Sequence, residues 1–210
     1  MHHKNKMTLD LQFQHPFSCV VNGPSGCGKT EWIQTLLHNS DFMIKNMPEK
    51  IIWCYNQWQP AYSTIQGVEF IEGLKGLNTL SGRSHLVILD DLMMEADKSV
   101  MDLFVRGRHR NISVIFVTHN IFYKTPALRT IKLNTNYMTL FKNPCDTSQI
   151  LSLGRQIFPG NSKHLQEAFT DATQRQYGYL FLDLRPHTHD NHRLRANIFP
   201  GEEQNIYFPK

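Results

Sequence analysis

The sequence predicts an α/β fold in which a mostly parallel central sheet carries helices on both faces. Apolar runs of strand length alternate with segments of helical periodicity, which is the pattern of such folds. Hydrophobic residues make up 40% of the 210 residues, enough to build a sizeable core. A chain of this length fits one domain, so we expect a single domain over residues 1–210, with a flexible N-terminal segment at 1–12 and a polar tail at 185–210.

The first strand is expected at residues 17–21, followed by a turn rich in glycine and a helix at 29–38. The helix places its apolar side chains on one face, as a helix packed against a sheet requires. These side chains are Trp32, Ile33, Leu36 and Leu37.

Further strands follow at intervals, and the run at 85–91 is continuously apolar, as in a central strand buried on both sides. Strands are predicted at 50–56, 68–71, 85–91, 113–118, 137–141 and 177–184. Helices are predicted at 99–106, from Asp146 to about Leu153, and at 162–172. From Arg185 onward the chain is polar, and we expect it to be loop-like. This order of elements is that of a RecA-like nucleotide-binding core.

The glycine-rich turn matches the phosphate-loop pattern G-x-x-x-x-G-K-[ST] at every position. Its residues are Gly23, Pro24, Ser25, Gly26, Cys27, Gly28, Lys29 and Thr30. Glycines let successive backbone N–H groups point at a phosphate, and the helix N-terminus adds partial positive charge. Lys29 is expected to reach the β- and γ-phosphates of ATP, and Thr30 to bind Mg²⁺. The strand before the turn and the helix after it argue against a turn without a ligand.

Two acidic residues, Asp90 and Asp91, end the apolar strand at the edge where parallel sheets present their active sites. Neighbouring side chains on a strand point to opposite sides, so we expect different roles for the two carboxylates. Asp90 is assigned to the Mg²⁺ shell and Asp91 to orienting and deprotonating the attacking water. An ordinary acidic turn is the alternative, and Glu95 is a weaker candidate for the base.

A polar residue is also expected beside the γ-phosphate at the end of the neighbouring strand. Asn120 and His119 stand there, and either could bond the γ-phosphate or the water. Asn56, at the end of the second strand, is a candidate for holding the catalytic acid off-line until a partner binds. Asparagine is also common at strand ends for purely local reasons.

Three arginines, Arg106, Arg108 and Arg110, lie between the acidic strand and the following strand. Cations favour helix C-termini, so a solvated basic helix end is one interpretation. The alternative is that one of them reaches the γ-phosphate of a neighbouring subunit as an arginine finger.

Together these stretches resemble the FtsK–HerA class of ATPases, and within it the viral DNA-packaging branch of Polinton-like and adintovirus-like elements and large DNA viruses. The resemblance runs from about residue 10 to 199. Besides the phosphate loop and the acidic strand, it rests on segments 107–113, 117–120, 155–160 and 177–180. Many relatives have Gln where this chain has His119 or Asn120, which leaves the identity of the sensor residue open.

The resemblance implies a homo-oligomeric ring at a capsid vertex that hydrolyses ATP with Mg²⁺ and translocates double-stranded DNA. Such a protein would be intracellular, in the host nucleus or cytoplasm, and transiently on the assembling virion. DNA contacts would be mainly to phosphate, with Lys124, Arg129, Lys132 and Lys142 as candidates. The formal charge of +4 suits a polyanionic partner without proving one. We expect no membrane segment and no separate nuclease domain.

Two other functional classes fit the phosphate loop. A small P-loop kinase would transfer the γ-phosphoryl group to a metabolite, and a nucleotide-switched scaffold would bind ATP without turning it over. Paired strand-end acids favour activation of water over both.

Overall fold

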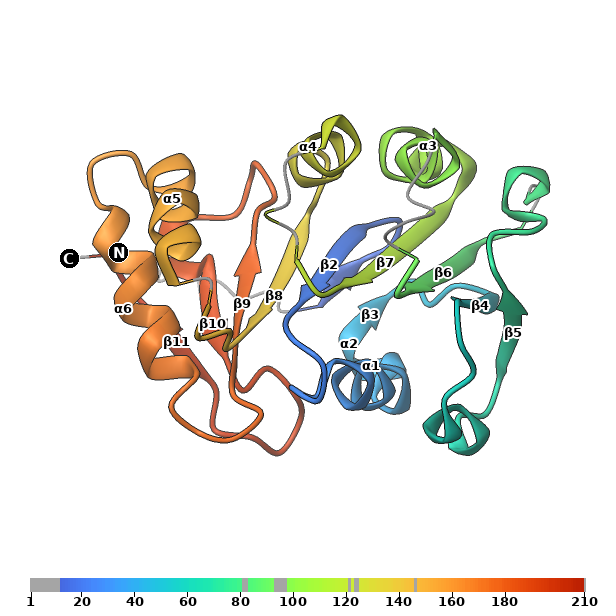
Figure 1. Cartoon of the computed structure of the whole chain (residues 1–210), viewed down its shortest axis with the longest axis horizontal. Helices are drawn as coiled ribbons and strands as arrows, with labels where there is room; N and C mark the ends of the chain where they lie inside the picture. Colours follow the sequence, from blue (N-terminus) through green and yellow to red (C-terminus); the bar gives the residue numbers. More distant parts are fainter. Residues whose placement is uncertain are drawn as a thin grey trace, which may run out of the picture.

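A nine-stranded sheet organises the described part of the chain (Figure 1). The computed structural model describes residues 12–80, 83–92, 98–120, 122, 125–145 and 147–209. The strand order is β11-β10-β9-β8-β2-β7-β6-β4-β5. Pairing is parallel from β8 to β5 and antiparallel from β8 to β11. The predicted α/β fold with a mostly parallel sheet is confirmed.

The strands of this sheet are β2 Ser18–Asn22, β4 Lys50–Tyr55, β5 Val68–Glu72, β6 His85–Asp90, β7 Ile112–Thr118, β8 Tyr137–Phe141, β9 Tyr179–Asp183, β10 Leu194–Ala196 and β11 Asn205–Tyr207. A separate parallel pair joins β1 Phe13–Gln14 to β3 Ile44–Lys45. Every residue of β2, β6, β7, β8 and β9 is buried, which explains why their sequences are mostly apolar.

Helices cover both faces of the sheet. Figure 1 shows α1 and α2 on one face, α3 and α4 on the other, and α5 and α6 at the end that carries β9, β10 and β11. The helices are α1 Lys29–His38, α2 Ser40–Met43, α3 Lys98–Arg106, α4 Pro126–Leu133, α5 Thr147–Ile157 and α6 Ser162–Ala172. Short 3₁₀ turns add η1 Pro60–Thr64, η2 Leu77–Thr79, η3 Gly107–Arg110 and η4 Asp190–His192. No described helix is long and apolar enough to cross a lipid bilayer.

Two hydrophobic cores lie on the two faces. One joins α3, α4, α5 and α6 to the sheet through side chains such as Leu103, Ile131 and Leu165. The other joins α1 to the sheet through Ile33 and Leu36. The apolar stripe predicted for 29–38 therefore faces the sheet.

Sequence patterns missed helix α4 and misjudged the segment after Arg185. The expectation of a loop-like tail is wrong at β10 and β11, which extend the sheet in antiparallel register. Arg195, in the middle of β10, is only 2% exposed and meets the Asp183 carboxylate of β9 at 3.4 Å. A charged residue can occupy a buried strand position when a partner strand supplies its counter-charge, and that partner lies outside the local sequence.

Candidate nucleotide-binding and active site

The predicted phosphate loop leaves β2 and enters α1, at the centre of the sheet. Gly28, which caps α1, has a φ of 100°, and Gly26 has a φ of 73°. A Cβ atom at Gly23 would lie 2.6 Å from Cβ of Phe141. These glycines are therefore required by left-handed backbone at two positions and by close packing at the third.

Lys29 is the buried cation of this loop, with only 8% of its surface exposed. Its Nζ donates to the carbonyl oxygens of Gly23 at 2.7 Å and Pro24 at 2.9 Å. Burial lowers the Lys29 pKa, and the charges of Asp90 and Asp91 partly oppose that shift. The ammonium group thus stands between its own loop and the acidic strand end.

Asp90 is the last residue of β6 and is 4% exposed. Its Oδ2 accepts a hydrogen bond of 2.7 Å from the Tyr62 hydroxyl of η1. Burial raises the Asp90 pKa, while the Tyr62 hydrogen bond and the Lys29 charge act in the opposite direction. A buried carboxylate beside a phosphate loop is a suitable ligand for a divalent cation.

Asp91 lies outside the strand, contrary to the sequence expectation. Its φ is 54°, in the left-handed region, so the alternation of side chains along β6 ends at Asp90. Both carboxylates consequently line the same cavity instead of pointing to opposite sides of a strand. Asp91 Oδ1 lies 3.2 Å from Nε2 of His119, which follows β7.

His119 connects the acidic residue to the phosphate loop, whereas Asn120 does not. Nδ1 of His119 lies 3.3 Å from Nζ of Lys29, so the ring bridges Lys29 and Asp91. The Asn120 side chain accepts a hydrogen bond of 2.8 Å from the backbone N–H of Phe122, a local turn contact. Of the two sensor candidates, the structure brings His119 to the cavity and turns Asn120 into the following loop.

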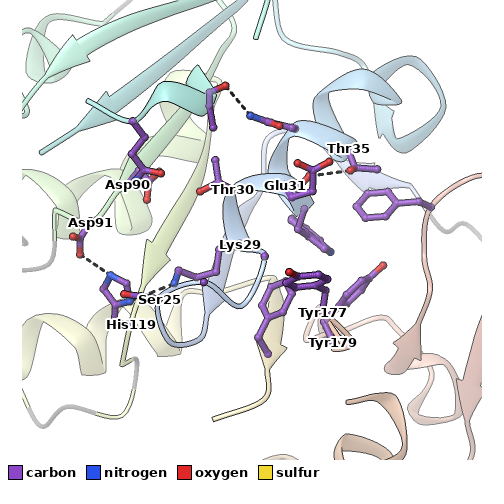
Figure 2. A pocket seen from close by; sticks show the side chains of 18 of the residues that line it. Ser25, Lys29, Thr30, Glu31, Thr35, Asp90, Asp91, His119, Tyr177 and Tyr179 are labelled. Atoms are coloured by element: carbon purple, nitrogen blue, oxygen red, sulfur yellow. Dashed lines mark hydrogen bonds and ion pairs between the residues drawn. The ribbon is translucent and has the colours of Figure 1, made fainter. Parts of the chain in front are cut away.

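These groups border a single cavity of about 770 Å³. Figure 2 shows Asp90, Asp91 and His119 on one side of Lys29, and Tyr177 and Tyr179 on the other. The lining residues are Ser25, Gly26, Gly28, Lys29, Thr30, Glu31, Trp32, Gln34, Thr35, Gln59, Ala61, Asp90, Asp91, His119, Phe141, Tyr177, Tyr179, Phe199 and Glu202. Gly23, Pro24 and Cys27 belong to the loop but do not line the cavity.

Thr30 and Asp90 present a hydroxyl and a carboxylate to this cavity. Mg²⁺ prefers oxygen ligands and commonly takes only one or two from a protein, with substrate phosphates and waters completing its shell. The two residues fit such a site. Among the described residues, no group of three or more His, Cys, Asp and Glu side chains could hold a metal ion.

The three predicted arginines all lie away from the cavity, in different surroundings. The Arg110 guanidinium donates to the carbonyl oxygens of Leu77 and Leu80 and lies 3.4 Å from Asp102, so it holds the fold together. Arg106 is exposed and 3.3 Å from Asp102, one helical turn away. Arg108 is exposed on a separate surface hollow between α3 and α4. Asn56 is exposed outside the cavity, and Glu95 lies outside the described residues.

Sequence reasoning missed two residues of the site, Tyr62 and Tyr177. Tyr62 precedes Asp90 by 28 positions and reaches it only because η1 folds over the end of the sheet. Tyr177 belongs to a segment that the family resemblance includes, but no motif gives it a role. Its position against the phosphate loop follows from the pairing of β9 with β8.

No protein-family model and no curated protein sequence matches the chain. Solved structures do. The genome packaging NTPase B204 of Sulfolobus turreted icosahedral virus 2, in complex with sulfate, matches with a TM-score of 0.56 at 13% identity, covering 92% of this chain and 97% of that one. The same protein with AMPPCP gives 0.54 at 14% identity, covering 93% and 98%.

The cytoplasmic domain of the type VII secretion ATPase EccC of Thermomonospora curvata gives a TM-score of 0.50 at 11% identity, covering 91% of this chain and 25% of that one. At such identities the likeness establishes a shared fold. This chain therefore has the RecA-like fold of P-loop NTPases, in agreement with the resemblance that its motifs indicated.

Proposed function

We propose that this chain is an ATP-hydrolysing DNA translocase of the FtsK–HerA class that packages viral double-stranded DNA into capsids. One observation carries the hydrolytic part: Lys29, the Asp90–Asp91 pair and His119 meet at one end of a single cavity. The packaging part is supported by the B204 packaging NTPase, whose fold this chain shares over nearly the whole length of both chains.

Each residue at this end of the cavity has a role that its position suits. Lys29 and the loop amides bind the β- and γ-phosphates of ATP, and Thr30 and Asp90 hold Mg²⁺. The bound cation would neutralise charge on the phosphate oxygens. Asp91, exposed on the cavity side and 3.2 Å from His119, orients and deprotonates the attacking water. His119 then senses the γ-phosphate from the position between Lys29 and Asp91.

The partners follow from the packaging proposal. The chain would act as a homo-oligomeric ring at a capsid vertex, inside the host cell and transiently on the assembling virion. Contacts to DNA phosphates would come from exposed cations such as Arg129 and Lys142. Lys132 is a weaker candidate because its ammonium lies 5.9 Å from the centre of the Phe122 ring. Lys124 lies outside the described residues.

Phosphate release, measured with and without double-stranded DNA for the wild type and Asp91→Asn, tests the proposal. We expect DNA to stimulate the wild type, and Asp91→Asn to lose about 100-fold or more in turnover, as removal of a general base does. Asp91→Asn should still bind ATP, since the phosphate loop is intact. Asn120→Ala is the matched control and should keep turnover near the wild-type value.

Three outcomes would overturn the proposal in different ways. Turnover without any effect of DNA would leave an ATPase that is not a translocase. A phosphorylated metabolite in place of free phosphate would indicate a kinase. Tight ATP binding with no turnover under any condition would indicate a nucleotide-switched scaffold.

A further inference from the structure

The cavity has a second end, which the proposed hydrolytic chemistry does not use. Whereas the end beside Lys29 is charged, this end is lined by aromatic rings from four parts of the chain. They are Trp32 of α1, Phe141 of β8, Tyr177 in the turn before β9, Tyr179 at the start of β9, and Phe199. Figure 2 shows Tyr177 and Tyr179 on the side of Lys29 away from Asp90. The cavity therefore runs from an acidic, hydrophilic end to an aromatic one.

Tyr177 is the ring of this group that remains open to a ligand. Its side chain is 61% exposed, whereas Tyr179 and Phe199 are buried at 7% and 8%. The Tyr177 backbone has a φ of 61°, in the left-handed region that is costly for a bulky residue. Strained backbone that persists at a cavity wall is a reason to look for a function there.

The turn that carries Tyr177 is tightly packed against the end of α6. A Cβ atom at Gly178 would lie 2.4 Å from the carbonyl oxygen of Ala172, so only glycine fits after Tyr177. The Tyr177 ring itself rests against the phosphate loop, where a Cβ at Gly28 would lie 3.3 Å from Tyr177 Cδ1. The ring is thus held at the rim of the loop.

Charge separates the two ends of the cavity. Lys29 is the one Lys or Arg side chain among the described lining residues, and it lies beside the acidic pair. At the aromatic end, Glu202 lines the cavity and accepts a hydrogen bond of 3.1 Å from the backbone N–H of Phe199. A Mg²⁺-bound polyphosphate is drawn toward Lys29, because the cation offsets the charges of Asp90 and Asp91, whereas Glu202 has no such cation beside it and repels phosphate. The uncharged part of a nucleotide therefore belongs at the aromatic end.

We propose that Tyr177 is the platform on which the nucleobase of the bound nucleotide stacks. This inference rests on the proposed binding of ATP at the phosphate loop and deepens it by assigning the base subsite. Stacking on an aromatic ring accepts every base, because each has a π-face, and loss of the ring commonly weakens binding about tenfold or more.

Tyr177→Asn tests the platform. Asparagine tolerates a positive φ better than tyrosine does, so the variant loses the ring without new backbone strain. Calorimetric titration in the presence of Mg²⁺ would compare ATP with inorganic tripolyphosphate, which has no base. We expect the affinity for ATP to fall about tenfold and the affinity for tripolyphosphate to stay unchanged. Tyr177→Phe keeps the ring and should bind ATP as the wild type does.

Two controls separate this proposal from the one on which it depends. Phe208→Asn removes a ring that is 57% exposed but lies outside the cavity, and it should not change either affinity. Lys29→Ala should weaken both ligands. If Lys29→Ala has no effect on either, the proposed nucleotide site is wrong and the base subsite with it.

The platform alone is overturned by either of two results while Lys29→Ala behaves as expected. One is a Tyr177→Asn variant that binds ATP as tightly as the wild type. The other is an equal loss of affinity for ATP and tripolyphosphate, which would make Tyr177 a support of the phosphate loop instead of a contact for the base.

Discussion

At the scale of single residues, the hydrogen bond from Tyr62 to Asp90 is the contact that the proposed metal site depends on most. The Tyr62 ring is 1% exposed and packs against Trp53 and Phe70, with ring centres 5.2 and 5.3 Å away. A hydroxyl on such a fixed ring can hold the carboxylate in one orientation. Tyr62 is therefore a positioning residue, because it acts on Mg²⁺ only through Asp90.

Replacing Tyr62 by phenylalanine should weaken the affinity of the site for Mg²⁺. A hydrogen bond to a charged group contributes about 1.5–3 kcal/mol, so we expect at least about a tenfold rise in the Mg²⁺ concentration for half-maximal phosphate release. Tyr55→Phe is the control, since Tyr55 belongs to the same aromatic cluster at 5.8 Å from Tyr62. Equal Mg²⁺ dependence in both variants would contradict the positioning role.

The same substitution should move the pH dependence of hydrolysis. Burial raises the Asp90 pKa, and the Tyr62 hydrogen bond partly offsets that rise by favouring the charged form. Tyr62→Phe removes this offset, so the Asp90 pKa rises further. Because Mg²⁺ binds the carboxylate and not the acid, the low-pH limb of Mg²⁺-dependent phosphate release should shift to higher pH. A limb that stays in place, or moves to lower pH, would contradict this assignment.

The raised Asp90 pKa also has a consequence for the stability of the chain without ligand. A carboxyl group whose pKa is higher in the folded than in the unfolded state contributes stability below its unfolded pKa. That contribution is lost as the pH rises through the folded pKa. At neutral pH the charged, buried Asp90 therefore destabilises the fold, as expected of a residue kept for binding a cation.

At the scale of elements, the contact between α5 and α6 depends on one glycine. A Cβ atom at Gly154 of α5 would lie 2.5 Å from the carbonyl oxygen of Ser162, at the start of α6. The atom that this Cβ would contact belongs to the backbone, which cannot rotate away as a side chain can. The two helices can approach so closely only because residue 154 has no side chain.

Gly154→Ala should therefore lower the free energy of unfolding by about 1–3 kcal/mol, the usual cost of overpacking. Urea denaturation followed by circular dichroism measures the change. Ser152→Ala is the control on the same helix, where the side chain is exposed, and it should stay within about 0.5 kcal/mol of the wild type. A stabilised Gly154→Ala variant would show that helix propensity outweighs the close approach.

Elements with strong local patterns could be predicted from the sequence, and those held by distant partners could not. Helices α1 and α6 and strand β8 match their predicted ranges, because each helix has an apolar stripe on its one buried face and the strand is buried throughout. Helix α4 also carries local signals, which the apolar pattern alone does not reveal. Its Thr125 side chain caps the first turn by accepting from the N–H of Leu128, and Pro126 occupies the first helical position.

Within the site, the phosphate loop follows from its motif, but the acidic end needed the fold. The left-handed backbone of Asp91 and the turn of Asn120 toward Phe122 depend on backbone conformations that residue types alone do not specify. The bridge that His119 makes from Lys29 to Asp91 arises because β7 lies between β2 and β6 in the sheet. Strand order is a property of the whole sheet, so no local pattern contains it.

At the scale of the whole molecule, the surroundings of the three arginines distinguish their proposed roles in a ring. Arg110 is bound to Leu77, Leu80 and Asp102, so its replacement should destabilise the fold instead of acting on catalysis alone. Arg108 is exposed on a hollow between α3 and α4, away from the cavity of its own chain. Within a proposed ring, Arg108 is thus the candidate for reaching a neighbouring subunit.

Mixing two inactive variants tests whether Arg108 acts in trans. Arg108→Ala keeps an intact cavity but lacks the finger, whereas Asp91→Asn keeps the finger but lacks the base. If the finger serves the neighbouring site, Arg108→Ala alone should lose about 10³-fold or more in DNA-stimulated turnover and Asp91→Asn alone about 100-fold or more, while both bind ATP normally. A mixed ring then contains interfaces at which an intact cavity faces an intact arginine, so mixing should restore part of the activity.

Arg106→Ala is the control and should be active alone. Activity that stays absent at every mixing ratio, in rings shown by pull-down on a tag carried by one variant to contain both, would contradict a role in trans.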